Sequence, residues 1–131
     1  MYEVTVESGF AARHAIAMAD GRMEASHSHP WHVAAAFRGE RLDPASGVLV
    51  DFLEVKAALD ALARELDGTD LNAHEAFRAG APSAERVAEF LARRLMKAMA
   101  GKAALYRLEV SEAPGCRAAF LCDVDAPARR V

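Results

Sequence analysis

Residues 51–66 read DFLEVKAALDALAREL, and this stretch decides the fold class because its apolar residues recur every three or four positions. The apolar residues that share one stripe of the helix are Phe52, Val55, Leu59, Leu62 and Leu66. Asp51 is a suitable N-terminal cap, and Glu54 follows it three residues later, as in a capping box. Gly68 stands just past the stripe, where a left-handed backbone can end a helix. The pattern therefore predicts a helix over residues 51–66.

A second stretch with the same periodicity, Ser83 to Ala100, follows after a loop. Its stripe consists of Val87, Phe90, Leu91, Leu95 and Ala98. Ser83 can cap this helix, Glu85 suits the positive end of its dipole, and Gly101 can end it. The middle of the chain is therefore predicted to hold two successive helices.

Strand patterns flank this helix pair on both sides. Before it, Tyr2–Phe10 alternates between apolar and polar residues, and His29–Phe37 predicts a second strand. After it, Ala104–Val110 and Arg117–Val124 predict two more strands, with a hairpin turn at Pro114-Gly115. The order ββααββ predicts an α+β fold, a four-stranded antiparallel sheet with both helices on one face.

The composition suits one folded domain: 131 residues, 53% of them hydrophobic, with a formal net charge of −3. We expect this domain to span residues 1–124 and a short C-terminal tail to span 125–131. The mildly acidic balance argues against a nucleic-acid partner, and the longest apolar run is too short to cross a membrane. The N-terminus does not resemble a signal peptide, so we expect a cytoplasmic protein. Its two cysteines, Cys116 and Cys122, are then expected to be reduced and to serve as packing residues.

Three of the five histidines lie where the first hairpin can bring them together. His27 and His29 are two residues apart at the start of a strand, so both imidazoles point to one face, and His14 follows the preceding strand closely. Three imidazoles around one point can hold a tetrahedral zinc ion with one position open for substrate, as in catalytic zinc sites. The spacing alone is also compatible with His27 and His29 as surface residues of a strand. His14 would then be a hydrogen-bonded residue at a helix end or in a loop. For His32 and His74 we expect surface positions.

Six motifs, in order along nearly the whole chain, resemble those of the 6-pyruvoyl-tetrahydropterin synthase and 6-carboxytetrahydropterin synthase family. They are Phe10–His14 (F-x-A-x-H), His27–Trp31 (H-G-H-x-[YW]), Gly47–Lys56 (G-x-V-x-D-F-x-x-L-K), Leu66–Asn72 (L-D-H-x-x-L-N), Pro82–Glu85 (P-T-x-E) and Val110–Pro114 (V-x-E-T-P). The resemblance implies the family's T-fold and a zinc ion held by His14, His27 and His29.

The resemblance also implies a small-molecule pterin substrate, 7,8-dihydroneopterin triphosphate or a close relative, whose side-chain hydroxyls the zinc holds. Glu112 matches the late glutamate that anchors the pterin ring, because a carboxylate can accept two parallel N–H donors. The plainer interpretation of Glu112 is a strand residue that faces water. The family likeness further implies a homo-oligomer, a trimer stacked into a hexamer with sites between subunits, in which Glu112 serves a zinc held by a neighbouring chain. The bare face and edges of the expected sheet agree with such association.

The chain departs from the family pattern at its catalytic cysteine, which would fall near Met23. Glu24 instead forms E-x-x-H-x-H, which resembles a branch of the family that carries glutamate in place of cysteine. Members of that branch are associated with cleavage of the substrate side chain to 6-hydroxymethyl-7,8-dihydropterin, a folate precursor. Glu24 can act as a base, as a displaceable fourth zinc ligand, or lie in solvent as a loop residue.

A second departure concerns the family's L-D-H motif. Asp67 is present and matches an auxiliary catalytic residue, but Gly68 replaces the histidine that this aspartate orients. His74 could replace that histidine only through a loop rearrangement. In addition, Ser28 and Ala113 replace a glycine and a threonine of the family motifs.

Together with the three histidines, the resemblance implies a zinc-dependent lyase-type enzyme that converts a pterin. Its product would be either a 6-carboxy pterin, on the route to deazapurine nucleosides such as queuosine, or the 6-hydroxymethyl pterin to which Glu24 points. An alternative is a catalytically degenerate module that binds zinc and a pterin or purine ring without converting it. A third is a related zinc reaction on a different substrate.

Overall fold

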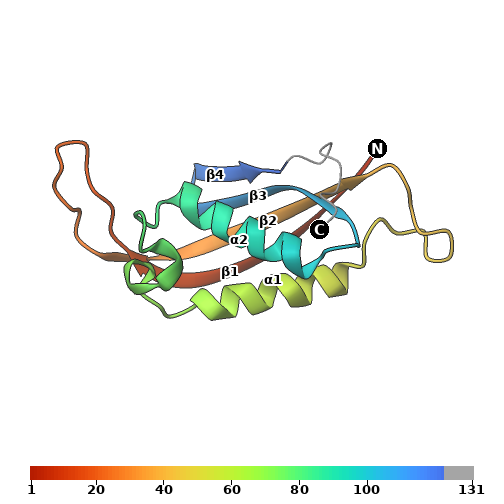
Figure 1. Ribbon diagram of the computed structural model, residues 1–131, viewed down its shortest axis with the longest axis horizontal. Helices are drawn as coiled ribbons and strands as arrows, with labels where there is room; N and C mark the ends of the chain where they lie inside the picture. Colours follow the sequence, from red (N-terminus) through yellow and green to blue (C-terminus); the bar gives the residue numbers. More distant parts are fainter. Residues whose placement is uncertain (123–131) are drawn as a thin grey trace.

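The computed structural model describes residues 1–122, which form a four-stranded antiparallel sheet and two helices (Figure 1). The strands lie in the order β1 (Tyr2–His14), β2 (His27–Gly39), β3 (Ala104–Ala113) and β4 (Cys116–Leu121). The helices α1 (Phe52–Leu66) and α2 (Ala84–Ala98) follow β2 in the chain. The predicted α+β fold in ββααββ order is confirmed. Residues 123–124 of the expected last strand and the tail at 125–131 lie outside the described residues, so the proposed domain boundary stays a prediction.

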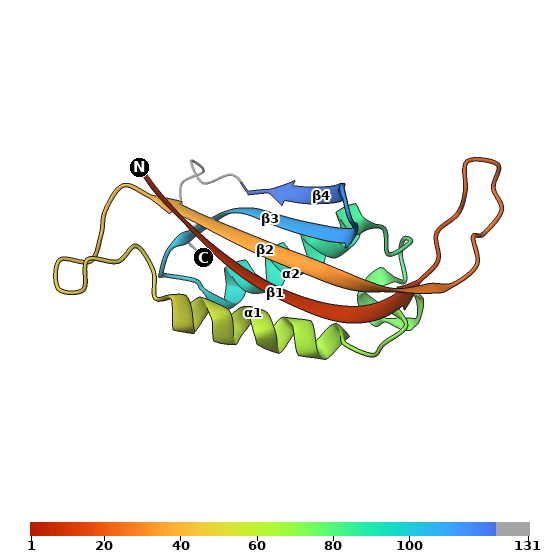
Figure 2. The same ribbon diagram turned by 180° about the vertical axis from the view of Figure 1, so that it is seen from behind.

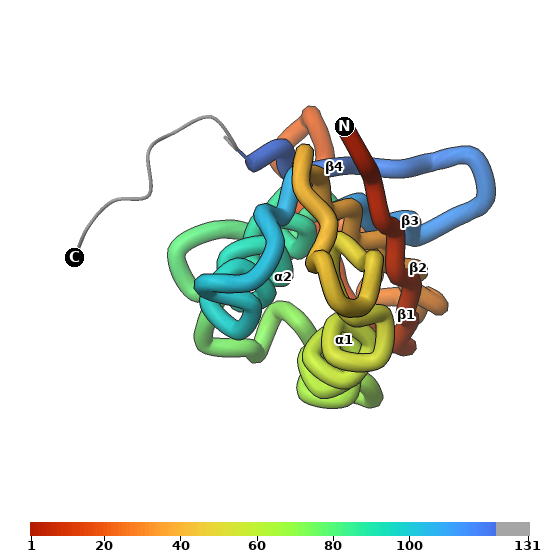
Figure 3. Tube along the Cα trace, turned by 90° about the vertical axis from the view of Figure 1, so that its right-hand side faces the viewer, coloured from red at the N-terminus to blue at the C-terminus, as the bar shows by residue number. Residues whose placement is uncertain are grey.

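Both helices cover the same face of the sheet, as the two opposite views show (Figures 1 and 2). Helix α1 packs mainly on β1, and α2 packs on β3 and β4. The end-on view shows the other face without a covering element among the described residues (Figure 3). The hydrophobic core therefore forms a single layer between the sheet and the helices.

The helix ends follow from local chemistry. The Asp51 carboxylate accepts from the Leu53 amide (2.8 Å), and the Ser83 hydroxyl accepts from the Arg86 amide (3.3 Å). Glu54 pairs with Lys102, so its carboxylate is engaged outside the expected capping box. Two short 3-10 turns, η1 (Leu71–Ala73) and η2 (Glu75–Phe77), occupy the connection between the helices and were not predicted.

The predicted apolar stripes are buried over most of their length but not at every position. Phe52 is 59% exposed, because burial in α1 begins only at Val55. In α2, Ala98 is exposed and Phe90 half-buried, while Met99, just past the helix, is buried instead. The helical period predicts the buried face of each helix. Where that face begins and ends depends on how far the sheet extends over the helix.

The first hairpin is longer than predicted, and its register brings its two ends together. β1 and β2 pair from Tyr2 opposite Gly39 to His14 opposite His27. In β1 the side chains of Val6, Phe10 and His14 alternate into the buried face. The hairpin therefore carries His14 to the end of the sheet on its helix-covered side.

A bulge breaks the predicted alternation in β3. Ala36 pairs with Arg107 and Phe37 with Leu105, so Tyr106 is an extra residue opposite β2. Leu105 and Leu108 consequently both face the core, although the simple alternation placed them on opposite faces.

Candidate functional site

Three histidines converge at the end of the sheet that the first hairpin closes. His14 pairs with His27 across the β1–β2 ladder, and His29 lies two residues further along β2, on the same face. One nitrogen from each ring lies within 4.8 Å of one nitrogen of each of the others. The ring centroids are 4.7 Å apart for His14–His27 and 4.3 Å apart for His27–His29. The structure therefore brings together the three residues that were predicted to bind a metal.

Hydrogen bonds to backbone carbonyls orient two of these rings. His14 Nδ1 lies 2.8 Å from the Pro82 carbonyl oxygen, and His27 Nδ1 lies 2.9 Å from the Ala25 carbonyl oxygen. A carbonyl only accepts, so each Nδ1 donates its proton, and in the neutral ring each Nε2 carries a lone pair. This is the arrangement in which a neutral imidazole can bind a metal through Nε2.

Trp31 supports two of the rings, those of His14 and His29. Its ring makes edge contacts with His14 (centroids 5.0 Å apart) and His29 (6.3 Å), and it is 2% exposed. Its indole Nε1 donates to the Ala12 carbonyl oxygen at 3.4 Å. Packing of this kind limits the rotation of both imidazoles.

The cluster contains buried acceptors that no donor satisfies. His14 Nε2, His29 Nε2 and Glu112 Oε2 are buried and lack a hydrogen-bond partner. His14 Nε2 nevertheless lies 3.0 Å from Glu112 Oε2, so with Nδ1 protonated a lone pair faces a carboxylate oxygen. A proton or a cation between them removes this repulsion, and the further orphaned nitrogen on His29 favours a cation shared by several nitrogens. Three imidazole nitrogens are a donor set that suits zinc.

The electrostatic surroundings keep His29 in the form that a metal needs. Burial lowers the pKa of His29 from its ordinary value, and the neighbouring His27 lowers it further. A ring that is neutral at neutral pH has its lone pair available, so a metal can bind without first displacing a proton from it.

Glu24 borders the cluster without joining it. Its Oε1 accepts from the Ile16 amide at 3.1 Å and lies 3.8 Å from His27 Nε2. The backbone of Glu24 also donates to the Ile16 carbonyl oxygen at 3.0 Å, which holds this part of the hairpin connection. With 29% of its side chain exposed, Glu24 is not a freely solvated loop residue.

Asp67 and His74 are engaged elsewhere. The Asp67 carboxylate accepts from the Ala11 amide at 2.8 Å and ties the end of α1 to β1. His74 Nδ1 accepts from the Ala76 amide at 3.1 Å, and its ring packs on Phe77 and Phe90. Among the described residues, the three histidines of the hairpin are the only set of histidine, cysteine or acidic side chains close enough to share a metal.

Glu112 lies beside the histidines of its own chain, whereas the family likeness implied service to a neighbouring chain. Val110 pairs with the buried Val33, and Glu112, two residues further along β3, faces the same side, next to His14. His32, by contrast, lies on the outer face, 57% exposed and 3.7 Å from a carboxylate oxygen of Glu7, as expected for a surface histidine.

A cavity of about 280 Å³ opens beside His14 and Glu112. Its other walls come from the start of α2, including Ser83 and Glu85, and from the start of β4, including Cys116. Cys116 is exposed, so the prediction that it is a packing residue is wrong. A second cavity of about 350 Å³ shares Glu112 as a wall and is otherwise lined mainly by apolar residues of β2 and the β3–β4 turn.

Some supporting residues were not identified from the sequence. The Pro82 carbonyl orients His14, and Asn72 binds both the amide and the carbonyl of Ala15 through its side chain. Pro82 and Asn72 lie inside two of the family motifs, and this was the sequence feature that could have indicated their importance. Their bonds join segments far apart in the chain, so periodicity could not reveal them.

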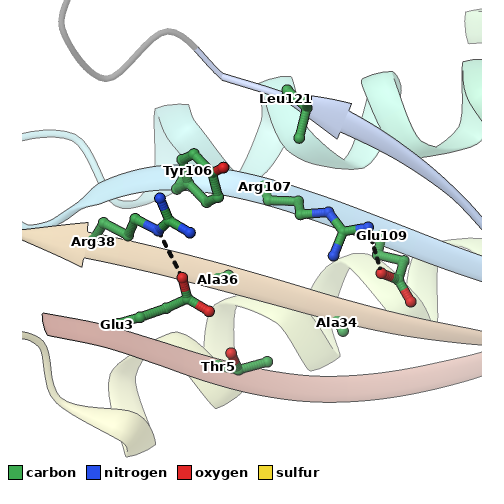
Figure 4. A pocket seen from close by; sticks show the side chains of 9 residues that line it. All are labelled: Glu3, Thr5, Ala34, Ala36, Arg38, Tyr106, Arg107, Glu109 and Leu121. Atoms are coloured by element: carbon green, nitrogen blue, oxygen red, sulfur yellow. Dashed lines mark hydrogen bonds and ion pairs between the residues drawn. The ribbon is translucent and has the colours of Figure 1, made fainter.

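A larger cavity, of about 430 Å³, lies on the outer face of the sheet (Figure 4). Its charged walls pair within the chain: Arg38 with Glu3 (2.6 Å) and Arg107 with Glu109 (2.8 Å). The Arg38 guanidinium also lies 3.5 Å from the centre of the Tyr106 ring. Because its charges are already paired, this cavity is a weaker candidate than the histidine cluster.

Comparisons with known proteins found a matching family model and similar solved structures. A family model described as 6-pyruvoyl tetrahydropterin synthase matches residues 3–122. The 6-pyruvoyl tetrahydropterin synthase of Caenorhabditis elegans has a TM-score of 0.78 at 22% identity, covering 94% of this chain and 98% of that chain. The Plasmodium vivax enzyme has a TM-score of 0.74 at 20% identity, covering 94% and 98%. The Plasmodium falciparum enzyme has 0.71 at 20%, covering 91% and 96%.

None of the curated proteins matches the chain. Within residues 1–122, no helix has the length and apolar character needed to cross a membrane.

Proposed function

This chain belongs to the 6-pyruvoyl tetrahydropterin synthase family, and we propose that it is a zinc-dependent enzyme that converts 7,8-dihydroneopterin triphosphate or a related pterin. The observation that carries the proposal is the convergence of three imidazole nitrogens within 4.8 Å, with unsatisfied acceptors on His14, His29 and Glu112. Such a set of buried acceptors is costly unless a cation or a donor-rich ligand meets it.

The proposed roles follow from position. His14, His27 and His29 hold the metal, which when bound supplies Lewis-acid polarisation of hydroxyl oxygens on the ligand's side chain. Glu112 binds the ring, because its carboxylate borders both cavities and can accept parallel N–H donors from a guanidine-like edge. The ring would therefore lie beside β3 and its side chain beside the histidines.

Glu24 is the proposed base. Its carboxylate is held by the Ile16 amide and lies close enough to His27 to reach the same ligand. Two solved structures of the Plasmodium vivax enzyme are described as catalytic-residue mutants in which a glutamate is replaced by alanine or cysteine. A catalytic glutamate in a relative of the same fold supports this role for Glu24. The 6-hydroxymethyl product is proposed because Glu24 resembles the glutamate branch of the family.

The test is the identification of products. Zinc-loaded protein is incubated with 7,8-dihydroneopterin triphosphate, and the products are separated and identified by mass spectrometry. We expect 6-hydroxymethyl-7,8-dihydropterin; acetaldehyde with a 6-carboxy pterin would show the other family reaction, and no turnover would reject both. Glu24→Gln should lower the rate by at least about 100-fold, the lower range for loss of a general base. Glu75→Gln, at an exposed position in η2, is the matched control and should retain the rate.

A binding module without catalysis is the second candidate, and one observation favours it. Asp67 binds a backbone amide and His74 caps η2, so the family's auxiliary pair of aspartate and histidine, which Gly68 already puts in doubt, is not formed among the described residues. Under this alternative, 7,8-dihydroneopterin binds tightly without turnover, and Glu24→Gln leaves its affinity unchanged. The auxiliary catalytic role of Asp67 stays a prediction, which Asp67→Asn would test through the turnover rate.

We also propose a homo-oligomer, a trimer or hexamer, in the cytoplasm. The outer face of the sheet and its edge strands β1 and β4 have no covering element among the described residues, and uncovered edges favour pairing with another chain. Sedimentation at micromolar concentration should show the oligomer, and a monomer alone would contradict it.

A further inference from the structure

We propose that Cys116 is a thiol-modification site, and that a group attached to its sulfur competes with the ligand for the cavity beside His14 and Glu112. The proposal rests on the proposed function only in taking that ligand to be a pterin. Its structural basis is that Cys116, His14 and Glu112 line the same cavity.

The hairpin register brings the thiol to this place. Cys116 pairs with Ala113 at the closed end of the β3–β4 hairpin, directly after Glu112 in the opposing strand. Ala118, two residues further along β4, pairs with the buried Val110 and lines the same cavity as Cys116. The alternation of β4 therefore places Cys116 on the helix-covered side of the sheet, at the end where the helices leave it accessible.

Two buried polar groups of the candidate site border the same cavity as Cys116. The His14 side chain is 2% exposed, and its Nε2 has no hydrogen-bond partner. Glu112 Oε2, 3.0 Å away, has none either. At about 280 Å³ the cavity lies near the lower end of the range for small-molecule sites, about 300 Å³. A bulky substituent on Cys116 that enters this cavity would therefore occupy space that a ligand needs.

The modification is a thiol–disulfide exchange with a low-molecular-weight disulfide. The Cys116 thiolate attacks one sulfur of the disulfide, a new S–S bond forms to Cys116, and the original S–S bond breaks. The second half of the reagent leaves as a thiolate, and the proton of the Cys116 thiol passes to solvent. No other oxidant is required, and an added thiol reverses the reaction.

Cys122 is a natural control because it has the same chemistry in a different setting. It is half-buried and packs against the core, and burial raises its pKa above the ordinary value. A buried, protonated thiol exchanges slowly. Cys116→Ser should therefore abolish the effects described below, whereas Cys122→Ser should leave them intact.

The first measurement locates the modification. The protein is treated with a limiting amount of glutathione disulfide, and the modified peptides are mapped by mass spectrometry. We expect Cys116 to react at least about tenfold faster than Cys122, because the thiolate and its exposure govern the exchange rate. Equal rates, or faster reaction at Cys122, would overturn the proposal.

The second measurement asks whether the attached group reaches the cavity. Side-chain imidazole resonances of the glutathionylated protein should shift at His14 and stay unchanged at His32, which lies on the outer face. This readout needs no pterin, so shifts absent from His14 would refute the proposal even if the enzyme is active.

The third measurement tests competition directly. Glutathionylation should weaken binding of 7,8-dihydroneopterin at least tenfold, and bound 7,8-dihydroneopterin should slow the modification of Cys116 by the same factor, because coupling between two ligands is reciprocal. Unchanged affinity would refute competition while leaving the proposed function intact. Failure of the unmodified protein to bind the pterin would refute the proposed function, and the imidazole resonances would still decide whether Cys116 controls the cavity.

Discussion

Replacing His29 with alanine should remove most of the stability gained from zinc without destabilising the metal-free protein. In the metal-free protein, the substitution removes a buried nitrogen acceptor that has no partner, a group that costs about 1–3 kcal/mol when unsatisfied. It also removes an edge contact with Trp31, which stabilises by about 1 kcal/mol. These terms oppose each other, so we expect the stability of metal-free His29→Ala to range from equal to the wild type to about 2 kcal/mol above it.

Zinc should stabilise the wild type more than His29→Ala. At a free zinc concentration 100 times the Kd, a single site that exists only in the folded state stabilises by about 2.7 kcal/mol. For a domain of this size that corresponds to a rise in Tm of about 10 °C. The variant loses one of three converging nitrogens, so its gain at the same zinc concentration should be small.

The assay is thermal unfolding and urea unfolding with zinc and with a chelator. His32→Ala is the matched control, since His32 lies three residues further along β2 but faces the outer side, where it makes only an exposed contact with Glu7. It should keep the full gain from zinc. The reasoning is refuted if His29→Ala gains as much stability from zinc as the wild type, or if His32→Ala loses that gain.

Three further predictions concern the scaffold around the site. Asp60 accepts hydrogen bonds from Ser8 (2.6 Å) and Lys56 (3.0 Å), and these lower the pKa of its carboxyl, Ser8 contributing more than Lys56. The resulting stabilisation is present above the pKa that Asp60 has in the unfolded chain. It is lost as the pH falls through the lower pKa of the folded protein. Asp60→Asn should therefore destabilise by about 1 kcal/mol at pH 7, since the pair is partly exposed, and the difference from wild type in urea unfolding should vanish in strong acid. Trp31→Phe removes an indole hydrogen bond and part of the support for two ligand rings, so calorimetric titration should show zinc binding weakened about tenfold. Gly68 has a φ of 73°, and a Cβ added there would meet only open space. Gly68→Ala should therefore cost about 1 kcal/mol from backbone strain alone, and an equal or higher Tm would contradict this.

Much of the site was predictable because its residues follow local rules. Two histidines two residues apart on a strand share a face in any sheet, and a hairpin brings a residue past its first strand near the start of its second. The placement of Glu112 and Cys116 was not predictable in this way. Their position relative to each other depends on the register shift between Ser111 and Ala113 at the closed end of the β3–β4 hairpin, which leaves no mark in the sequence pattern.

The amino-acid sequence by itself determined the order of the elements, the buried stripe of each helix and the identity of the three imidazoles. Periodicity and capping are short-range properties, readable from neighbouring residues. Only the tertiary structure decided that the Pro82 carbonyl orients His14, that Asp67 binds the Ala11 amide, and that a thiol lines the cavity beside His14 and Glu112. These contacts join segments far apart in the chain, and their geometry depends on strand register and helix placement, which the whole packed core sets together.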